Sequence, residues 1–255
     1  FFSEQLLSSN TEFANISSSM SFINSKEYTG SEILDLYNPL VFEITTNYQT
    51  QCGFLWLQKR WSSMQGTGLL FSNNKNNALI ITNSHVVVPE NLEGEYQCTI
   101  KRNSQEDACN VSLVAIGKDD LDLALLKVAT DGTWEDFEVP FETSGNLNQG
   151  DPCFAIGNAQ GEGLSITNGI ISKIEDFFIR TSTPISSGNS GGPLILSEGA
   201  VFAGIITAQD AREDSQNMNY AIPVDYLLNQ ENWIFLEETL EDLDETKLLL
   251  GKMLR

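Results

Sequence analysis

The stretch SSGNSGGPLIL, residues 186–196, surrounds Ser190 with three glycines and a proline, just before an apolar run. So many glycines in so few positions indicate that the backbone comes very close to another group. If Ser190 attacks a carbonyl, fixed donors must meet the developing oxyanion, and the backbone amides of Gly188 and Ser190 could supply them. We therefore predict a nucleophilic serine with an oxyanion hole formed by Gly188, Asn189 and Ser190, in which Asn189 shapes the loop. The alternative is a glycine-rich hairpin with a surface serine.

Two further residues could complete this chemistry. His85, in LIITNSHVVV, is the single histidine of the chain, and histidine can accept and return a proton near neutral pH. Asp122, in DDLDLALLKV, precedes an apolar run, and a carboxylate drawn inside with that run needs a donor such as the imidazole N–H. Asp119 and Asp120 lie outside the run and are typical of a solvated loop. Taken alone, a histidine at the end of a strand also fits a structural role.

The composition excludes several classes of function. The 255 residues include 35 acids and 14 bases, for a net charge of −21, which argues against binding to nucleic acid. No apolar run approaches the roughly 18 residues that a membrane span requires. With one histidine and no CxxC pair we expect no metal site, and we expect no other cofactor.

The cysteines leave two alternatives open. Cys98 and Cys109 flank TIKRNSQEDA, which is typical of a hairpin, so they form either a cross-strand disulfide or two buried thiols. Sequons begin at Asn15 and Asn110, and these triplets are consistent with secretion. We expect a secretory, extracytoplasmic or organellar location rather than a cytosolic one.

The order of elements predicts a β protein. Residues 1–30 are rich in Ser and Asn and indicate an irregular arm, and GSEILDLYNPLVFEI then predicts a short helix capped by Ser31 and a strand from Val41. About a dozen short β-rich runs follow up to Pro223, which favours antiparallel barrels or a sandwich. Beyond Pro223, leucines recur near helical spacing, which predicts amphipathic helices; these are Leu236, Leu240, Leu243, Leu250 and Leu254.

Three motifs together resemble those of the chymotrypsin-fold serine proteases. TNSHVV, DLALLKV and GNSGGPL occur in the chain order His, Asp, Ser, and GTGLLFS, VFAGIIT and NYAIPVDYL add likeness to the HtrA/Deg branch over about residues 31–228. The resemblance implies an all-β fold of two antiparallel six-stranded β-barrels with the catalytic residues in the cleft between them. The expected units are an arm at 1–30, a barrel with His85 and Asp122 at 31–135, a barrel with Ser190 at 136–223, and C-terminal helices at 224–255.

The same resemblance implies a serine endopeptidase that forms an acyl-enzyme. Ser190 would be the nucleophile, His85 the general base and Asp122 the residue that orients the imidazole. The segment GIITA would pair with an extended peptide substrate. Trypsin-like enzymes hold an acid six positions before the nucleophile, where this chain has Pro184. Ile185 follows, and Thr207 and Ala208 face them, so we predict cleavage after small or medium aliphatic residues and not after Lys or Arg.

The sequence also departs from the family pattern. The residues beyond the region of resemblance are too few for the PDZ modules that are typical of HtrA enzymes, so we expect a protease domain without PDZ. The segment RTSTPISSGNSGG carries Ser182 where the family has Asp. The alternative function is a non-catalytic peptide-binding or assembly subunit on the same fold, with the C-terminal helices as the surface for a protein partner or a second copy. In either case the acidic surface favours basic segments of a partner.

Overall fold

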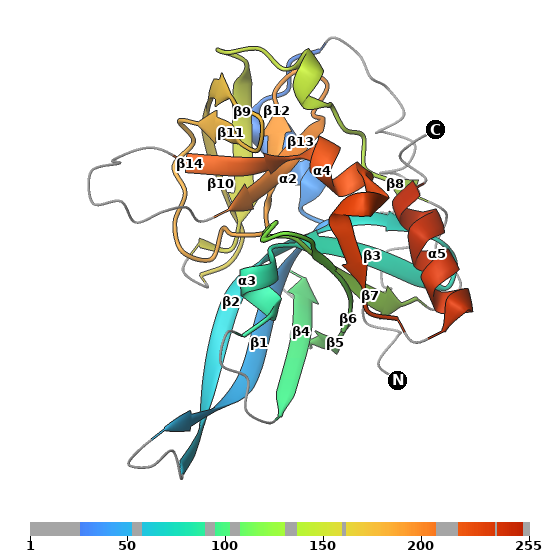
Figure 1. The fold of residues 1–255 in the computed structure, drawn as a ribbon. Helices are drawn as coiled ribbons and strands as arrows, with labels where there is room; N and C mark the ends of the chain where they lie inside the picture. The colour runs from blue at the N-terminus through green and yellow to red at the C-terminus, as the bar shows by residue number, and fades with distance from the viewer. Residues whose placement is uncertain are drawn as a thin grey trace.

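Two β units lie side by side in the computed structural model, which describes residues 26–52, 58–89, 95–102, 108–130, 137–159, 162–207, 219–237 and 239–251. The second unit is a closed barrel of six antiparallel strands, and the mostly β fold that we expected is confirmed. The first unit differs from a six-stranded barrel. It is a nine-stranded antiparallel sheet that curls into half a barrel (Figure 1). It has more than six strands partly because β8 and β15, from later in the chain, pair with it.

The order of strands in the first unit is β15-β6-β7-β3-β2-β1-β4-β5, with β8 paired to β2. Two long strands, β1 and β2, form a hairpin that projects from the body of the molecule (Figure 1). The strand bounds are β1 Val41–Cys52, β2 Gln58–Asn73, β3 Asn77–Thr82, β4 Tyr96–Arg102, β5 Cys109–Asn110, β6 Ser112–Gly117, β7 Ala124–Ala129, β8 Phe137–Glu138 and β15 Trp233–Phe235.

The closed barrel has the order β10-β11-β14-β13-β12-β9. Its strands are β9 Pro152–Gly157, β10 Ser165–Ile174, β11 Ile179–Thr181, β12 Pro193–Leu196, β13 Phe202–Thr207 and β14 Asn219–Pro223. Strands β12 and β13 are buried along their whole length. Leu194 and Ile206 pack inside the barrel, whereas Ile195 and Ile205 pack in the core of the first unit. The strands that follow the Ser190 loop are therefore fixed against both units.

The first described helix, α2 (Gly30–Tyr37), begins two residues earlier than a cap at Ser31 would place it. Its N-cap is Thr29, which forms a capping box: the Glu32 amide donates to Thr29 Oγ1 at 3.3 Å, and the Thr29 amide donates to Glu32 Oε2 at 2.8 Å. The prediction of Ser31 as the cap was wrong, because the reciprocal pair needs a carboxylate three residues after the cap. The arm up to residue 25 lies outside the described residues.

The C-terminal segment contains helices, as expected, and also a strand. It runs through α4 (Val224–Leu228), the 3-10 turn η4 (Gln230–Asn232), β15 and α5 (Leu240–Gly251). Leu236, which follows β15 and lies outside α5, is 44% exposed, and Leu240, the first residue of α5, is 79% exposed. Leu250 of the expected stripe is buried, together with Thr246 and Leu249 of α5, and Leu254 lies outside the described residues. None of the helices among the described residues is both long and apolar enough to cross a membrane.

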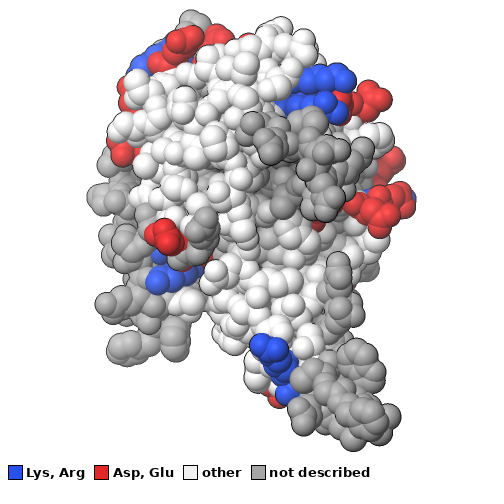
Figure 2. All heavy atoms as spheres, turned by 90° about the vertical axis from the view of Figure 1, so that its left-hand side faces the viewer, with Lys and Arg blue, Asp and Glu red and all other residues white. Residues whose placement is uncertain are grey.

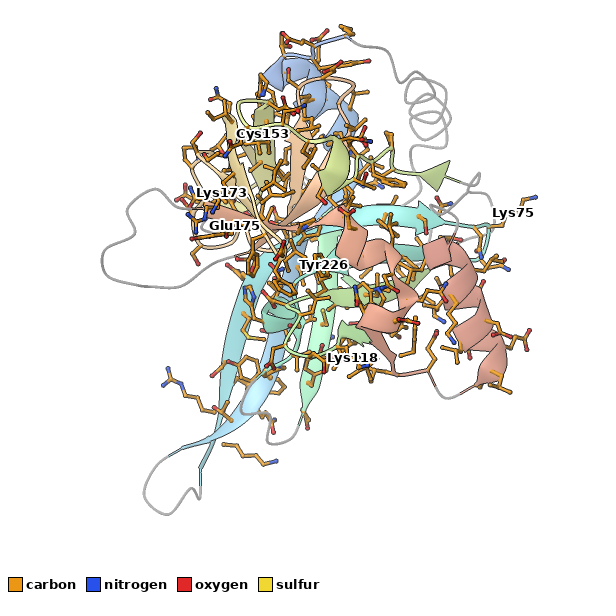
Figure 3. All side chains as sticks on the ribbon, turned by 45° about the horizontal axis from the view of Figure 1, so that its top comes forward. Lys75, Lys118, Cys153, Lys173, Glu175 and Tyr226 are labelled. Carbon is orange, nitrogen blue, oxygen red and sulfur yellow. The ribbon has the colours of Figure 1, made fainter. Side chains whose placement is uncertain are left out.

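The strand register decides between the two alternatives for the cysteines. Cys109 on β5 lies opposite Ile100, whereas Cys98 on β4 lies opposite Thr46 of β1. No disulfide joins the two, and Cys98 is a buried thiol whose pKa is raised by burial. Cys153, also a thiol, lies inside the closed barrel (Figure 3). Cys98 and Cys109 are therefore two thiols, of which Cys98 is buried, as the second alternative stated, and Cys109 is only partly buried.

Charged side chains are unevenly spread over the surface. The face in Figure 2, which is the left-hand side of Figure 1, is mostly formed by uncharged residues in its described part, with acids and bases near its margins. Lys173 and Glu175 form an ion pair at the end of β10, with 2.8 Å between Nζ and Oε1 (Figure 3). The acids that concern the candidate site lie in the cleft described below.

Candidate active site

The single histidine and its carboxylate partner lie on neighbouring segments of the first unit. His85 belongs to the short helix α3 (Ser84–Val87), which follows β3, and Asp122 lies on the loop between β6 and β7. His85 Nδ1 is 2.7 Å from Asp122 Oδ2. The Asn83 side-chain amide donates to the backbone carbonyl of Asp122 at 2.8 Å and ties the two segments together. The pairing expected from the sequence is therefore formed.

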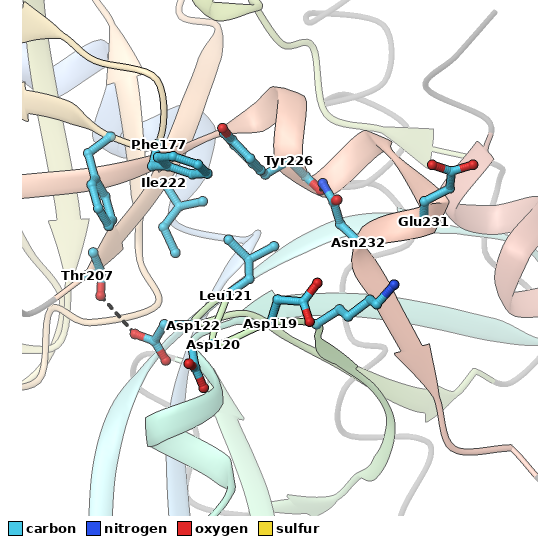
Figure 4. A pocket seen from close by; sticks show the side chains of 12 residues that line it. Asp119, Asp120, Leu121, Asp122, Phe177, Thr207, Ile222, Tyr226, Glu231 and Asn232 are labelled. Carbon is cyan, nitrogen blue, oxygen red and sulfur yellow. Dashed lines mark hydrogen bonds between the residues drawn. The ribbon is translucent and has the colours of Figure 1, made fainter.

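The Asp122 carboxylate accepts more hydrogen bonds than the one from the imidazole. The further donors are the His85 amide at 3.0 Å, the Ser84 hydroxyl at 2.8 Å and the Thr207 hydroxyl at 2.8 Å. Thr207 reaches it from β13 of the other unit (Figure 4). Burial by itself would raise the pKa of Asp122, but the hydrogen bonds from His85 and Thr207 and the nearby imidazole outweigh it and lower the pKa to about 2. The carboxylate is therefore ionised at neutral pH.

This arrangement fixes the state of the imidazole. Because a carboxylate can only accept, we assign the Nδ1 proton of neutral His85 to the bond with Asp122, which leaves the lone pair on Nε2. Among the described residues no group hydrogen-bonds Nε2, and the His85 side chain is 46% exposed. The imidazole can therefore take a proton from a hydroxyl at Nε2, and the charged ring would be stabilised by Asp122.

Ser190 lies at the end of a tight loop of the closed barrel and is separated from β12 by Gly191 and Gly192. Gly188 has φ of +94°, a conformation that favours glycine, and Asn189 donates its amide to the Ser186 carbonyl at 3.1 Å. Within the described part of the chain, no carbonyl or side chain accepts from the amides of Gly188 and Ser190. These two amides are the donors expected for an oxyanion. Asn189 is buried and serves the shape of the loop instead, since its amide is engaged.

The loop with Ser190 and the helix with His85 approach each other across Gly66 of β2. A Cβ on Gly66 would lie 2.6 Å from the Val86 side chain and 3.0 Å from the Ser190 carbonyl oxygen. A larger residue at this position would push the two segments apart. The Ser190 hydroxyl makes no hydrogen bond to His85 or to any other described residue, and catalytic hydrogen bonds often form only once substrate is bound.

The residues expected to line the specificity pocket have different environments. Pro184 is exposed, and its carbonyl accepts from Thr167 Oγ1 at 2.8 Å. Ile185 is partly buried against the core of the closed barrel. Thr207 is buried and donates to Asp122, a role that the sequence did not indicate. Ala208 lies outside the described residues.

A cleft of about 680 Å³ begins beside Asp122 and Thr207 and runs between the two units (Figure 4). Acids and aromatic rings line its walls, among them Asp119, Asp120, Glu231, Phe177 and Tyr226. A second cavity of about 580 Å³ lies on the other side of the Asp122 loop and includes His85, Tyr48 and Met64. His85 lines the second cavity alone, whereas Asp122 lines both, so the Asp122 loop forms the wall between them.

Asp119 and Asp120 lie in the turn that precedes Asp122 on the loop between β6 and β7. Both have positive φ, 52° and 62°, which is uncommon for residues other than glycine and most readily adopted by Asn and Asp. The Lys118 amide donates to the Asn232 carbonyl at 2.8 Å, so the C-terminal segment holds this turn from outside. As the sequence predicted for solvated loop acids, both carboxylates are exposed.

Comparison with known proteins gives a consistent set of relatives. A family model described as "Trypsin-like peptidase domain" matches residues 66–203. The chain is 34% identical over 198 residues to Protease Do-like 5, chloroplastic, of Arabidopsis thaliana, which covers 69% of this chain and 59% of that protein. It is 32% identical over 177 residues to Serine protease Do-like HtrA of Bacillus subtilis, which covers 63% of this chain and 37% of that protein. The chain thus spans 59% of the length of the Arabidopsis protein and 37% of the length of the Bacillus protein.

A solved structure has the same fold. The structure described as "HtrA-type protease AlgW with decapeptide" superposes with a TM-score of 0.59 at 24% sequence identity, and the match covers 77% of this chain and 64% of that one. At this level of identity the match shows the fold alone. It agrees with the arrangement of a closed barrel beside a curled sheet.

Proposed function

This chain belongs to the trypsin-like peptidase family, and from that premise we propose that it is a serine endopeptidase in which Ser190, His85 and Asp122 form the catalytic triad. One observation carries the proposal. The Asp122 carboxylate holds His85 through Nδ1 at 2.7 Å and leaves Nε2 without a partner among the described residues. This is the state in which an imidazole acts as a general base for a hydroxyl.

The proposed reaction proceeds through an acyl-enzyme. Ser190 Oγ attacks the carbonyl carbon of the peptide while its proton passes to His85 Nε2, and the ionised Asp122 stabilises the imidazolium. The amides of Gly188 and Ser190 donate to the oxyanion. The imidazolium then gives its proton to the leaving amine, and a water molecule, deprotonated by the same imidazole, hydrolyses the ester.

We propose that the bond cut follows a small or medium aliphatic residue of an extended or unfolded chain. Among Pro184, Ile185 and Thr207 there is no acid that could pair with the cation of Lys or Arg, and burying that cation without a partner would be unfavourable. Farther from the bond, the acids Asp119, Asp120 and Glu231 of the cleft favour basic side chains, an attraction that salt would screen.

A digest of a peptide library, combined with fluorophosphonate labelling, tests the proposal. Ser190→Ala is expected to lose turnover by about 10⁴-fold or more and to lose all labelling, because it removes the nucleophile. The matched control is Ser187→Ala, which changes an exposed serine of the same loop and should keep both. Wild-type turnover in Ser190→Ala would show that another group attacks the bond.

The digest also distinguishes the alternative function. If the wild-type chain binds peptides but neither cleaves nor takes the label, the fold serves as a non-catalytic peptide-binding or assembly module. Cleavage after Lys or Arg would contradict the proposed aliphatic pocket while leaving the triad in place.

A further inference from the structure

Thr67 contacts the nucleophile loop from the other unit of the molecule. It lies on β2 of the nine-stranded sheet and is fully buried. Its amide donates to the Ser190 carbonyl at 2.8 Å, and its Oγ1 donates to the Gly188 carbonyl at 2.7 Å. One threonine thus binds the carbonyls of the same two residues whose amides are the proposed oxyanion donors.

The hydroxyl of Thr67 is itself held in one orientation. The Asn158 amide, at the end of β9, donates to Oγ1 at 2.9 Å, so the hydroxyl proton must point away from it and toward Gly188. The Thr67 carbonyl accepts from Thr82 Oγ1 at 2.7 Å. Every polar atom of Thr67 therefore has a partner, and the whole group is buried, which makes its geometry well defined.

The loop also fits closely against this residue. A Cβ on Gly191, the residue after Ser190, would lie 2.1 Å from the Thr67 carbonyl oxygen. The loop can therefore approach Thr67 only because position 191 lacks a side chain. Thr67 thus contacts Gly188 and Ser190 through hydrogen bonds and Gly191 through close packing.

We propose that Thr67 is a positioning residue that aims the amides of Gly188 and Ser190 at the oxyanion. The inference rests on the proposed function. In a tight turn the directions of a residue's N–H and C=O are linked through its φ and ψ. When the Gly188 and Ser190 carbonyls are fixed, the amides of the same two residues are therefore restricted as well. An oxyanion hole accelerates the reaction only if its donors are already oriented, and Thr67 supplies that orientation from across the cleft.

Three variants separate positioning from stability. Thr67→Val removes the hydroxyl and keeps the branched shape, Thr67→Ala removes it without adding a methyl group, and Thr67→Ser restores it. The matched control is Ser72→Ala on the same strand, where a buried hydroxyl donates to the Leu249 carbonyl at 2.9 Å, away from the candidate site. Each variant is assayed for kcat and KM on a peptide substrate, for the rate of fluorophosphonate labelling, and for Tm.

Thr67→Val and Thr67→Ala are expected to lower kcat roughly 10- to 100-fold with little change in KM, because the hydroxyl matters mainly in the transition state. The labelling rate should fall with kcat, since the phosphonyl oxygen uses the same two amides. Thr67→Ser should stay within about threefold of the wild-type chain. Ser72→Ala should lose Tm and keep kcat.

The proposal is overturned if Thr67→Val and Thr67→Ala keep kcat, or if their loss is in KM alone. It is also overturned if Thr67→Ser is as impaired as Thr67→Val, or if neither hydroxyl-free variant folds, because Thr67 would then serve the fold and not the site. An active Ser190→Ala variant would instead refute the proposed function, so the two failures are distinguishable.

Discussion

The acid–base half of the candidate site lies on the nine-stranded sheet and the nucleophile half on the closed barrel, and each is held by a threonine from the opposite unit. Thr207 of the barrel donates to the Asp122 carboxylate at 2.8 Å. Thr67 of the sheet binds the carbonyls of Gly188 and Ser190 at 2.7 and 2.8 Å. In the first contact the barrel supports a residue of the sheet, and in the second the sheet supports a loop of the barrel.

The difference lies in what each threonine acts upon. Thr207 acts on a charge, so we expect its effect to depend on pH through the ionisation of Asp122. Thr67 acts on neutral backbone groups, so we expect its effect to depend on geometry and not on pH. The two halves of the candidate site are thus held together by an electrostatic contact from Thr207 and a geometric contact from Thr67.

The largest loss of kcat should follow from a change to the Asp122 carboxylate itself. Asp122→Asn replaces an acceptor of both the imidazole and the Thr207 hydroxyl by an amide, and it permits the wrong tautomer of His85. We expect kcat at pH 7 to fall by about 10⁴-fold, measured on a peptide substrate. Asp244→Asn, an exposed acid of α5, is the control for loss of one negative charge and should be unchanged. A fall of less than tenfold would show that Asp122 does not orient the base.

The residues of the proposed triad could be selected from the sequence because their motifs are local. Each of His85, Asp122 and Ser190 stands in a short stretch whose glycines or apolar neighbours mark it, and the structure brings His85 and Asp122 within hydrogen-bond distance. The closed six-stranded barrel was expected from the resemblance that these motifs carry, whereas the short β-rich runs by themselves left barrels and a sandwich open.

The threonines could not be predicted in the same way. Thr67 and Thr207 lie within strands, where threonine is a common residue, and their partners are distant in sequence. The strand β15 was missed because Trp233–Phe235 is short and pairs with β6, far earlier in the chain. The N-cap was assigned to Ser31 instead of Thr29 because both residue types favour that position, but Ser31 lies in the first turn of α2 and the reciprocal bonds with Glu32 identify Thr29.

A smaller effect is expected when only the contact from the barrel is removed. Thr207→Val keeps the shape of the side chain but removes one donor to Asp122, so the pKa of Asp122 should rise from about 2 toward its ordinary value of 3.8. We expect kcat to fall roughly 10-fold, because Asp122 still holds His85 through the remaining bonds. Steady-state kinetics at pH 7 measure this change.

The pH dependence of stability checks the electrostatic origin of the same effect. A carboxyl whose pKa is lowered in the folded chain contributes stability that is complete above its unfolded value, near pH 4, and is lost as the pH falls through about 2. The difference in the free energy of unfolding between the wild-type chain and Thr207→Val should be about 1 kcal/mol at pH 6 and should shrink toward pH 2. A difference that is the same at both pH values would assign Thr207 to packing.

The smallest effect is the coupling between the two threonines. If Thr67 serves only the oxyanion donors and Thr207 only Asp122, the losses of kcat in Thr67→Val and Thr207→Val should multiply in the double variant, with a coupling below about threefold. A route for stronger coupling exists, since the Gly191 amide donates at 2.9 Å to the carbonyl of Ile206, the residue before Thr207. A double variant no slower than the worse single variant would show that this bond joins the two contacts into one network, and that the halves of the site are positioned together.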